Sequence, residues 1–183
     1  MPRLASPPPV QGCSPCSICP RADSPSHTGD LAIAILDKNA VGRTSPPTLN
    51  EVEKGAIRRF AEALGDFNPV YYDEEYARAA GYPTVVAPPT FPACFHTSAD
   101  LRELLGVAVK SLLHAEQSFE YERPILAGDR IFVATRVADV QVRTGPAGRM
   151  DVAVLEDEGR DEEGALVFRA RRTLVVRAAS KEA

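Results

Sequence analysis

The sequence lacks an apolar run long enough to cross a membrane. A transmembrane helix needs about 18 or more consecutive apolar residues, whereas the longest candidate here spans only residues 31–36. The start of the chain also lacks the charged region followed by an apolar core that marks a secretory signal. We therefore expect a soluble, cytoplasmic protein that does not work at a membrane.

The sequence also lacks an excess of basic residues. Its formal net charge is -4, while a nucleic-acid-binding protein normally carries a basic face that pairs with phosphates. No glycine-rich phosphate-binding loop is present either, so we expect no nucleotide cofactor. At 183 residues, with 44% hydrophobic and 25% charged residues, the chain suits one globular domain.

A complete set of metal ligands is missing as well. Cys13, Cys16 and Cys19 have CxxCxxC spacing, and His27 follows them. Thiolates at such spacing can share a zinc or a cluster iron, but these sites normally use four ligands held by a folded scaffold. No fourth thiolate lies at a suitable distance, and no apolar periodicity surrounds the three. The sequence therefore predicts no metal site.

The N-terminal segment has the composition of a disordered tail. Residues 1–30 hold seven of the sixteen prolines and are otherwise rich in Ser, Cys and Gly. Such a composition cannot bury enough apolar area to offset the conformational entropy of the chain. We expect a Pro/Ser/Cys-rich tail over residues 1–30 and one folded domain over residues 31–183.

Two short helices are predicted in the first half of the domain. The first covers residues 50–64, with Asn50 or Thr48 as its N-cap and Gly65 as its end. Its apolar residues recur at helical spacing: Ile57, Phe60, Ala61 and Leu64. The second covers residues 73–80, begins at Asp73 and ends at Gly81.

A third helix is predicted from Pro92 to about Leu105. Proline suits the first turn of a helix but not its interior. An apolar stripe runs through the segment and comprises Phe91, Cys94, Phe95, Leu101, Leu104 and Leu105. The stripe predicts a well-buried helix.

The remainder of the chain reads as a β-meander. Strands are predicted over residues 111–123, 130–143, 149–156 and 165–177, with a charged loop over 157–164. Strict alternation of apolar and polar residues predicts an antiparallel sheet with one buried face. The predicted fold class is α+β: one hot-dog domain, in which a curled antiparallel sheet wraps around a central helix.

The most informative segment is Gly-Asp-Phe-Asn-Pro-Val-Tyr-Tyr-Asp over residues 65–73. It resembles the active-site loop of the MaoC-like, (R)-specific enoyl-thioester hydratases and dehydratases, whose pattern is Gly-Asp-x-Asn-Pro-(aliphatic)-His-x-(Asp/Glu). Every fixed position is present except the histidine, which is Tyr71 here.

The resemblance extends over roughly residues 35–178. Residues 60–66 and 75–81 are similar to the family's helices, and residues 113–124 and 126–129 to its first long strands. Val-Ala-Pro-Pro-Thr-Phe over residues 86–91 resembles the approach to its central helix. These elements are similar to the N-terminal-type MaoC dehydratase domain, which includes the non-catalytic subunit of mycobacterial (3R)-hydroxyacyl-carrier-protein dehydratase.

The resemblance implies a site. In the family, the loop aspartate and histidine hold one water and move its protons, and a backbone N–H at the start of the central helix polarises the thioester carbonyl. Asp66 is then the carboxylate, Asn68 orients the loop and Tyr71 stands at the histidine position. Pro89, Thr90 and Phe91 are expected to contact the substrate. No cofactor is implied.

Tyrosine is a poor replacement for histidine as a base. A phenol has an ordinary pKa of about 10 and an imidazole one of about 6.5. General acid–base assistance is typically worth about 10² to 10⁴ in rate, so the loss of one member is expected to be severe.

Each candidate residue also has a structural reading. Asp66 can cap the following turn, and Tyr71 can be a partly buried aromatic residue. His114 is either an interface histidine or a substitute acid–base group supplied across a dimer, and His96 is either structural or near an acyl tunnel. Three arginines can meet coenzyme A phosphates or serve as solubilising edge residues: Arg171, Arg172 and Arg177.

Three functional hypotheses follow. The first is the acyl-chain-binding, weakly active or inactive subunit of a hydratase/dehydratase in fatty-acid metabolism, acting on coenzyme A or carrier-protein thioesters. Its partner is a histidine-bearing MaoC-like subunit. The second is a self-sufficient homodimeric enoyl-coenzyme A hydratase that uses Asp66 with Tyr71 or His114. The third is a non-enzymatic hot-dog protein that only binds acyl thioesters. All three predict a dimer.

Overall fold

The computed structural model describes residues 36–105, 112–145 and 148–177, all of which belong to one unit, residues 32–183. The predicted tail over residues 1–30, with its three cysteines, lies outside the described residues. No helix within the described ranges is long and apolar enough to span a membrane.

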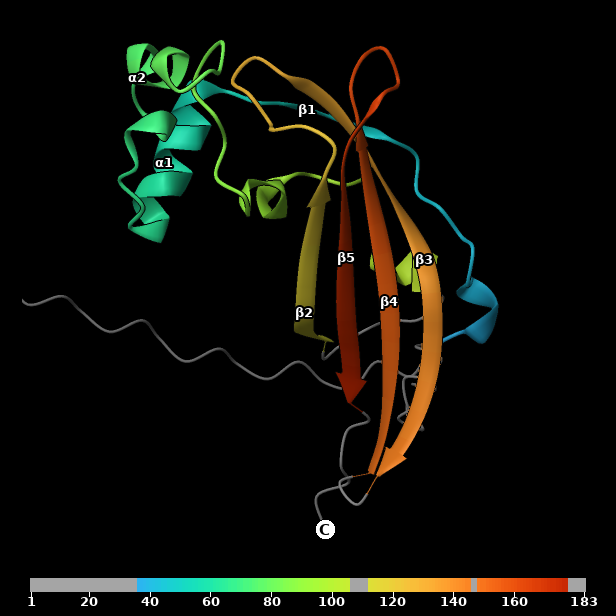
Figure 1. Cartoon of the computed structure of the whole chain (residues 1–183). Helices are drawn as coiled ribbons and strands as arrows, with labels where there is room; N and C mark the ends of the chain where they lie inside the picture. The colour runs from blue at the N-terminus through green and yellow to red at the C-terminus, as the bar shows by residue number, and fades with distance from the viewer. Residues whose placement is uncertain (1–35, 106–111, 146–147, 178–183) are drawn as a thin grey trace, which may run out of the picture. The chain divides into compact units, whose positions relative to one another are not determined.

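The core of the domain is a five-stranded antiparallel sheet (Figure 1). The strand order is β1-β3-β4-β5-β2, so β1 and β2 form the two edges. The bounds are β1 Thr48–Glu51, β2 Leu112–Tyr121, β3 Arg130–Gly145, β4 Gly148–Arg160 and β5 Leu166–Arg177. The predicted α+β hot-dog class and the antiparallel sheet are confirmed. The predicted meander holds for β3, β4 and β5, whereas β2 pairs with β5 and not with β3.

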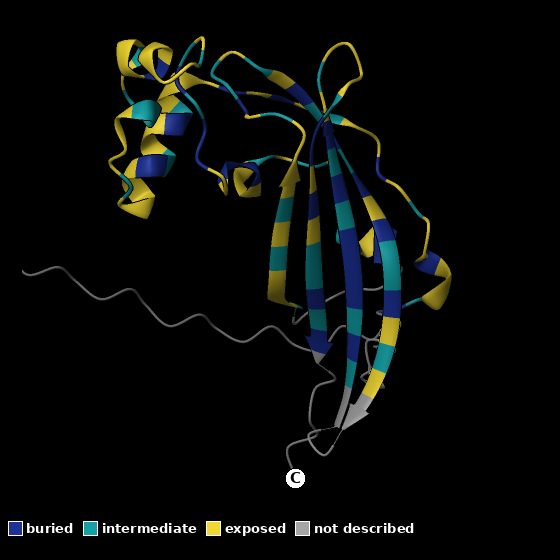
Figure 2. Cartoon of the chain, in the orientation of Figure 1, coloured by how far each residue is buried: buried dark blue, intermediate teal, exposed yellow. Residues whose placement is uncertain are grey.

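The predicted alternation places one face of β3 in the core. Ile131, Val133, Thr135 and Val137 are all at most 1% exposed, and in Figure 2 buried residues alternate with more accessible ones along this part of the strand. The pairing register puts Phe168, Ala170, Arg172 and Leu174 of β5 on the same face. We call this surface the inner face of the sheet.

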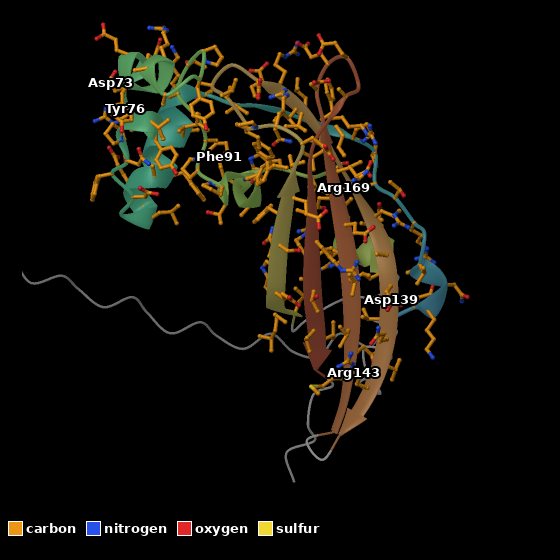
Figure 3. All side chains as sticks on the ribbon, viewed as in Figure 1. Asp73, Tyr76, Phe91, Asp139, Arg143 and Arg169 are labelled. Atoms are coloured by element: carbon orange, nitrogen blue, oxygen red, sulfur yellow. The ribbon has the colours of Figure 1, made fainter. Side chains whose placement is uncertain are left out.

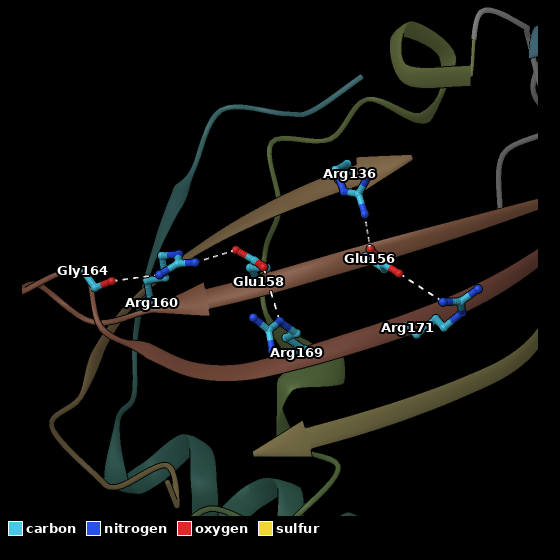
Figure 4. Close-up of polar contacts among 7 residues, drawn as sticks. All are labelled: Arg136, Glu156, Glu158, Arg160, Gly164, Arg169 and Arg171. Atoms are coloured by element: carbon cyan, nitrogen blue, oxygen red, sulfur yellow. Dashed lines mark hydrogen bonds and ion pairs between the residues drawn. The ribbon is translucent and has the colours of Figure 1, made fainter. Parts of the chain in front are cut away.

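Strand β4 continues well past its predicted end at residue 156. The predicted charged loop over residues 157–164 was wrong for its first four residues, which pair with both neighbouring strands. The charged residues at this end of β4 resemble a loop in the sequence, but the carboxylates on its outer face are paired with arginines (Figure 4). Glu156 contacts Arg136 and Arg171, at 2.6 and 3.1 Å. Glu158 contacts Arg160 and Arg169, at 2.9 and 3.4 Å.

The first helix begins later than predicted, because residues 48–51 form the edge strand β1. Asn50 and Thr48 are therefore not N-caps. Helix α1 spans Lys54–Leu64 and has no side-chain cap, while Gly65 ends it as predicted in a left-handed conformation, φ 69°. Helix α2 spans Glu74–Ala79, close to the prediction. One turn of 3-10 helix, η1, lies at Lys38–Ala40.

The predicted continuous helix from Pro92 to Leu105 was wrong. A 3-10 turn, η3, spans Phe91–Cys94, and the chain then becomes extended at Phe95 before a short helix, α3, at Leu101–Leu105. The side chain of Asn50 accepts a hydrogen bond from the His96 N–H at 2.8 Å and donates one to its carbonyl at 3.0 Å. The backbone groups of His96 therefore have partners outside any helix.

Two further contacts hold the linker between η3 and α3. The Ser98 N–H donates to the Thr48 hydroxyl at 2.8 Å, and the Ser98 hydroxyl donates to the Pro46 carbonyl at 2.6 Å. The Asp100 carboxylate then accepts from the Arg102 N–H at the start of α3. Because the apolar stripe is interrupted, Cys94 is exposed rather than buried in a helical stripe.

Candidate functional site

The motif loop connects α1 and α2 through a 3-10 turn, η2, at Pro69–Tyr71. Two side chains of the motif brace its own backbone: the Asp66 carboxylate accepts from the Asn68 N–H at 3.1 Å, and the Asn68 amide oxygen accepts from the Val70 N–H at 3.2 Å. Asp and Asn commonly stabilise turns in this way. Asp66 therefore stabilises the turn, as one of its two expected roles requires. This bond uses one carboxylate oxygen, Oδ1.

Tyr72 and Asp73 fix the far side of the loop. The Tyr72 hydroxyl donates to the Asp66 carbonyl at 2.9 Å, and the Arg58 guanidinium lies over the Tyr72 ring, 5.8 Å from its centroid. Asp73, labelled with Tyr76 in Figure 3, caps α2 by accepting from the N–H groups of Glu75 and Tyr76. Tyr71 therefore lies between Val70 and Tyr72, which both hydrogen-bond within the loop.

The environment of Tyr71 works against a role as a base. Partial burial is the largest effect that raises the pKa of its phenol above the ordinary value of 10, and the negative charge of Asp66 raises it further. Tyr71 is consequently a neutral hydrogen-bond donor at physiological pH. A phenol with a raised pKa is less suited than an imidazole to act as a general base near neutral pH.

The motif loop borders a pocket of about 600 Å³. Asn68, Val70 and Tyr71 line one side, and the Pro88-Pro89 segment together with Pro124 and Ile125 lines another. Four tyrosines contribute to the wall: Tyr71, Tyr76, Tyr82 and Tyr121. Its volume lies within the range of small-molecule sites, and such a mostly apolar wall with a few polar tips is typical of them.

Tyr121 closes the pocket with its polar end satisfied. Its hydroxyl donates to the Pro89 carbonyl, and burial raises the pKa of Tyr121 to about 12. It is therefore a neutral donor that ties the edge strand β2 to the proline segment.

The predicted substrate contacts separate in the structure. Pro89 lines the pocket together with Asn68 and Tyr71. Thr90 is exposed, and Phe91 is 4% exposed in the core, where its ring meets Phe60 edge to face. His114 lies on the inner face of β2 beside a different cavity. Within one chain, it is not brought to the pocket that Tyr71 lines.

The backbone donors expected at the start of a central helix are already used. The Phe91 N–H donates to the Pro88 carbonyl at 2.9 Å and the Ala93 N–H donates to the Thr90 carbonyl at 3.0 Å. Pro92 has no N–H. These three residues therefore offer no free donor to a thioester carbonyl.

Two of the three arginines considered as phosphate contacts lie on opposite faces of the sheet. Arg171 is on the outer face, paired with Glu156, while Arg172 is on the inner face, paired with Asp157. Adjacent residues of a strand point to opposite faces, so these two do not converge on one phosphate. The side chain of Arg177 lies outside what the structure describes.

Comparison with known proteins identifies the family. The family model for the FAS1-like dehydratase domain region matches residues 39–170. The UPF0336 protein SCO4636 of Streptomyces coelicolor is 40% identical over 151 residues, which cover 80% of this chain and 98% of that protein. The chain belongs to the MaoC-like hot-dog dehydratases.

Solved structures agree with this MaoC-like assignment. The truncated HadBC (3R-hydroxyacyl-ACP dehydratase) complex of Mycobacterium tuberculosis is similar with a TM-score of 0.66 and 28% identity, over 74% of this chain and 96% of that chain. The ChsH1-ChsH2 complex of the same organism shares the fold, with a TM-score of 0.66 and 21% identity, over 79% of this chain and 94% of that chain. A hydratase/dehydratase role is the function that this membership supports.

Several residues of the MaoC-like pocket were not singled out from the sequence. Tyr76 lies in α2, Tyr82 lies in the segment after it, and Tyr121 lies at the end of β2. A signal existed for Tyr121, because it alternates with Gln117 and Phe119 as residues on one face of a strand do. Nothing in the local pattern marks Tyr76 or Tyr82, since their approach to Tyr71 depends on how α2 packs.

Proposed function

We propose that this chain is the acyl-chain-binding, non-catalytic subunit of an (R)-specific hydratase/dehydratase. The complex interconverts 3-hydroxyacyl and trans-2-enoyl thioesters of coenzyme A or acyl carrier protein in fatty-acid metabolism. The observation that carries the proposal is Tyr71 in the place of the family histidine, with its pKa raised rather than lowered. A general base requires a pKa near the working pH.

Two further observations support an inactive site. The N–H groups of Phe91 and Ala93 are donated within the η3 turn, so the electrostatic stabilisation that a free helix start provides is absent there. The Asp66 carboxylate braces the loop through Asn68. The pocket itself remains large and mostly apolar, which favours retained binding of an acyl group.

The proposal requires a second, histidine-bearing MaoC-like subunit. Both HadBC and ChsH1-ChsH2 were solved as complexes, which supports an assembly of two such domains. We propose the partner along β2, an edge of the sheet whose pairing among the described residues is with β5. Leu113 is 53% exposed on this strand, and an unpaired edge is a template for a partner strand.

The test is hydration of crotonyl-coenzyme A by the purified chain, followed by loss of enoyl absorbance. We expect no turnover above the uncatalysed rate by the chain alone. Addition of a histidine-bearing MaoC-like partner should restore turnover. Asp66→Asn in this chain should leave the restored rate within about twofold, because the partner's loop performs the proton transfers.

Two outcomes would overturn the proposal. Robust activity of the isolated chain that Asp66→Asn abolishes would establish a self-sufficient homodimer, and His114→Gln would then show whether His114 supplies the missing group. Binding of acyl thioesters without turnover in the presence of any MaoC-like partner would instead indicate a non-enzymatic acyl-binding protein. Sedimentation of a stable monomer at micromolar concentration would exclude the homodimer.

A further inference from the structure

A polar layer crosses the inner face of the sheet, where an apolar surface is expected. The Asp157 carboxylate on β4 accepts from the Thr135 hydroxyl on β3 at 2.6 Å and from the Arg172 guanidinium on β5 at 2.9 Å. Gln117 on β2 pairs with Arg172 in the register. The layer therefore spans four adjacent strands with Thr135, Asp157, Arg172 and Gln117.

This polar layer divides the hydrophobic core into two parts. On β3, Val133 belongs to one buried cluster and Val137 to the other, with Thr135 between them. On β5, Ala170 and Leu174 are separated in the same way by Arg172. Thr135 is 0% and Asp157 7% exposed. Burial of a charged pair is costly unless its polar atoms have hydrogen-bond partners. A buried polar atom of the layer without a partner therefore calls for an explanation.

The layer is incomplete at one buried atom. Arg172 Nε is buried and has no hydrogen-bond partner. The residue Arg172 also lines a cavity of about 160 Å³ between the inner face and the linker that follows η3. The cavity is more than ten times the roughly 10–15 Å³ that one water needs. It has room for a short end of a ligand.

Other polar side chains at this cavity are also uncommitted. Gln117 and His114 of β2 both line it, and within the described residues neither side chain makes a hydrogen bond. Thr97 of the linker lines it from the opposite side. The cavity therefore presents hydrogen-bonding groups from both sides, beside apolar contacts from Phe95 and Phe168.

We infer that this cavity is a subsite for a neutral oxygen, a hydroxyl or keto group, on the distal part of the acyl chain. The Gln117 amide and the Thr97 hydroxyl line the cavity beside Arg172, and both can donate a hydrogen bond to such an oxygen. The charge of Arg172 is already balanced by Asp157 at 2.9 Å. A carboxylate would bring an additional charge into the site without a dedicated partner. The inference rests on the proposed acyl-binding function.

The cavity lies one aromatic layer beyond the pocket that Tyr71 lines. Tyr121 borders the pocket and Phe168 borders the cavity, and their ring centroids are 6.2 Å apart. The same proline-rich segment borders both, with Pro89 on the pocket side and Pro92 on the cavity side. An acyl chain that extends from the pocket past these rings would bring its distal carbons to the polar layer.

The test is calorimetric binding of three thioesters to the full chain: octanoyl-coenzyme A, its ω-hydroxy analogue and its ω-carboxy analogue, each also loaded on acyl carrier protein. We expect the ω-hydroxy chain to bind about tenfold more tightly than the plain chain, as one additional hydrogen bond supports. Gln117→Leu should remove most of this preference. Ser118→Ala, on the outer face of the same strand, should preserve it.

A second variant replaces the layer by apolar side chains. Thr135→Val, Asp157→Leu and Arg172→Met together remove the buried charges as a set, a change that is often tolerated, and thermal unfolding checks the fold. The variant should bind the plain chain in preference to the hydroxylated one. Equal binding of both by the wild type would show that the layer is only structural and overturn the inference, leaving the proposed function intact. Preference for the carboxylate would overturn the neutral assignment. Failure of every thioester to bind would overturn the proposed function as well.

Discussion

The Asn50 side chain and the His96 backbone exchange two hydrogen bonds, at 2.8 and 3.0 Å, across 46 residues of sequence. This pair fixes the edge strand β1 to the linker between η3 and α3. It replaces the helical bonds that a continuous central helix would make there. The break in turn leaves the inner face of the sheet open to the cavity beside Arg172.

Replacement of Asn50 by alanine should destabilise the protein through this pair. The substitution removes the partners of one N–H and one carbonyl, and Asn50 itself is 7% exposed. We expect a loss of about 1–2 kcal/mol in the free energy of unfolding, since His96 is partly open to water. Urea titration measures it. Gln141→Ala, an amide truncation at an exposed position, should change stability by less than about 0.5 kcal/mol.

Two glycines should respond to alanine with opposite signs. Gly159 on β4 pairs with Phe168, whose ring would lie 2.1 Å from an added Cβ. Gly159→Ala should therefore cost about 1–3 kcal/mol by overpacking. Gly55 lies in α1, where an added Cβ meets only the mobile end of Arg59, so Gly55→Ala should stabilise by about 0.5–1 kcal/mol. Thermal unfolding of both variants compares them, and equal shifts would contradict the packing argument.

The ion pairs of Glu158 should add to the free energy of unfolding at neutral pH, and this contribution should be lost in acid. A hydrogen bond from Arg160 is the largest cause that lowers its pKa, and Arg169 adds to it. A carboxylate whose pKa is lowered in the folded state stabilises the protein at pH values above its unfolded pKa of about 4.5. This stabilisation is lost as the pH falls through the folded-state pKa. Because the pairs are exposed, the effect should be about 0.2–1 kcal/mol.

The measurement is the unfolding free energy of Glu158→Gln relative to wild type at about pH 7 and about pH 3. The difference should shrink at the lower pH. Glu163→Gln, at an exposed carboxylate without an ion pair among the described residues, should show no such convergence. A constant deficit for Glu158→Gln at both pH values would indicate that packing, rather than charge, is what the side chain contributes.

The sequence was informative wherever the physical cause was local. Alternation along β3 and the cap at Asp73 depend on neighbouring residues, and both were predicted. The broken helix was not predictable in this way, because its cause is Asn50, distant in sequence from His96. The extension of β4 was missed for a related reason. Asp157 looks like a loop residue until Thr135 and Arg172 are known to face it.

The same limit applies to the candidate site. The motif itself located Asp66, Asn68 and Tyr71, since they lie in one continuous loop. The direction of the Tyr71 pKa follows from its burial and its distance from Asp66, which the chain order alone does not give. Tyr82 entered the pocket only through tertiary packing.

Tyr71→His is the sharpest test of the site. The substitution restores an imidazole beside Asp66, with an ordinary pKa of about 6.5. We expect the isolated variant to hydrate crotonyl-coenzyme A at least about tenfold faster than the wild-type chain. The gain should fall short of the full 10² to 10⁴ of acid–base catalysis, because the N–H groups of Phe91 and Ala93 are still donated within their turn.

The control for this gain is the double variant Asp66→Asn, Tyr71→His. It keeps the imidazole, and the amide oxygen of the new asparagine can still accept the hydrogen bond from the Asn68 N–H. It removes the carboxylate that would hold the water together with the histidine. Activity of the single variant that disappears in the double variant would show that Asp66 is positioned for chemistry and that the tyrosine is one cause of the inactivity. If Tyr71→His gains nothing while still binding acyl thioesters, the missing donors at η3, and not the tyrosine, are what make this chain inactive.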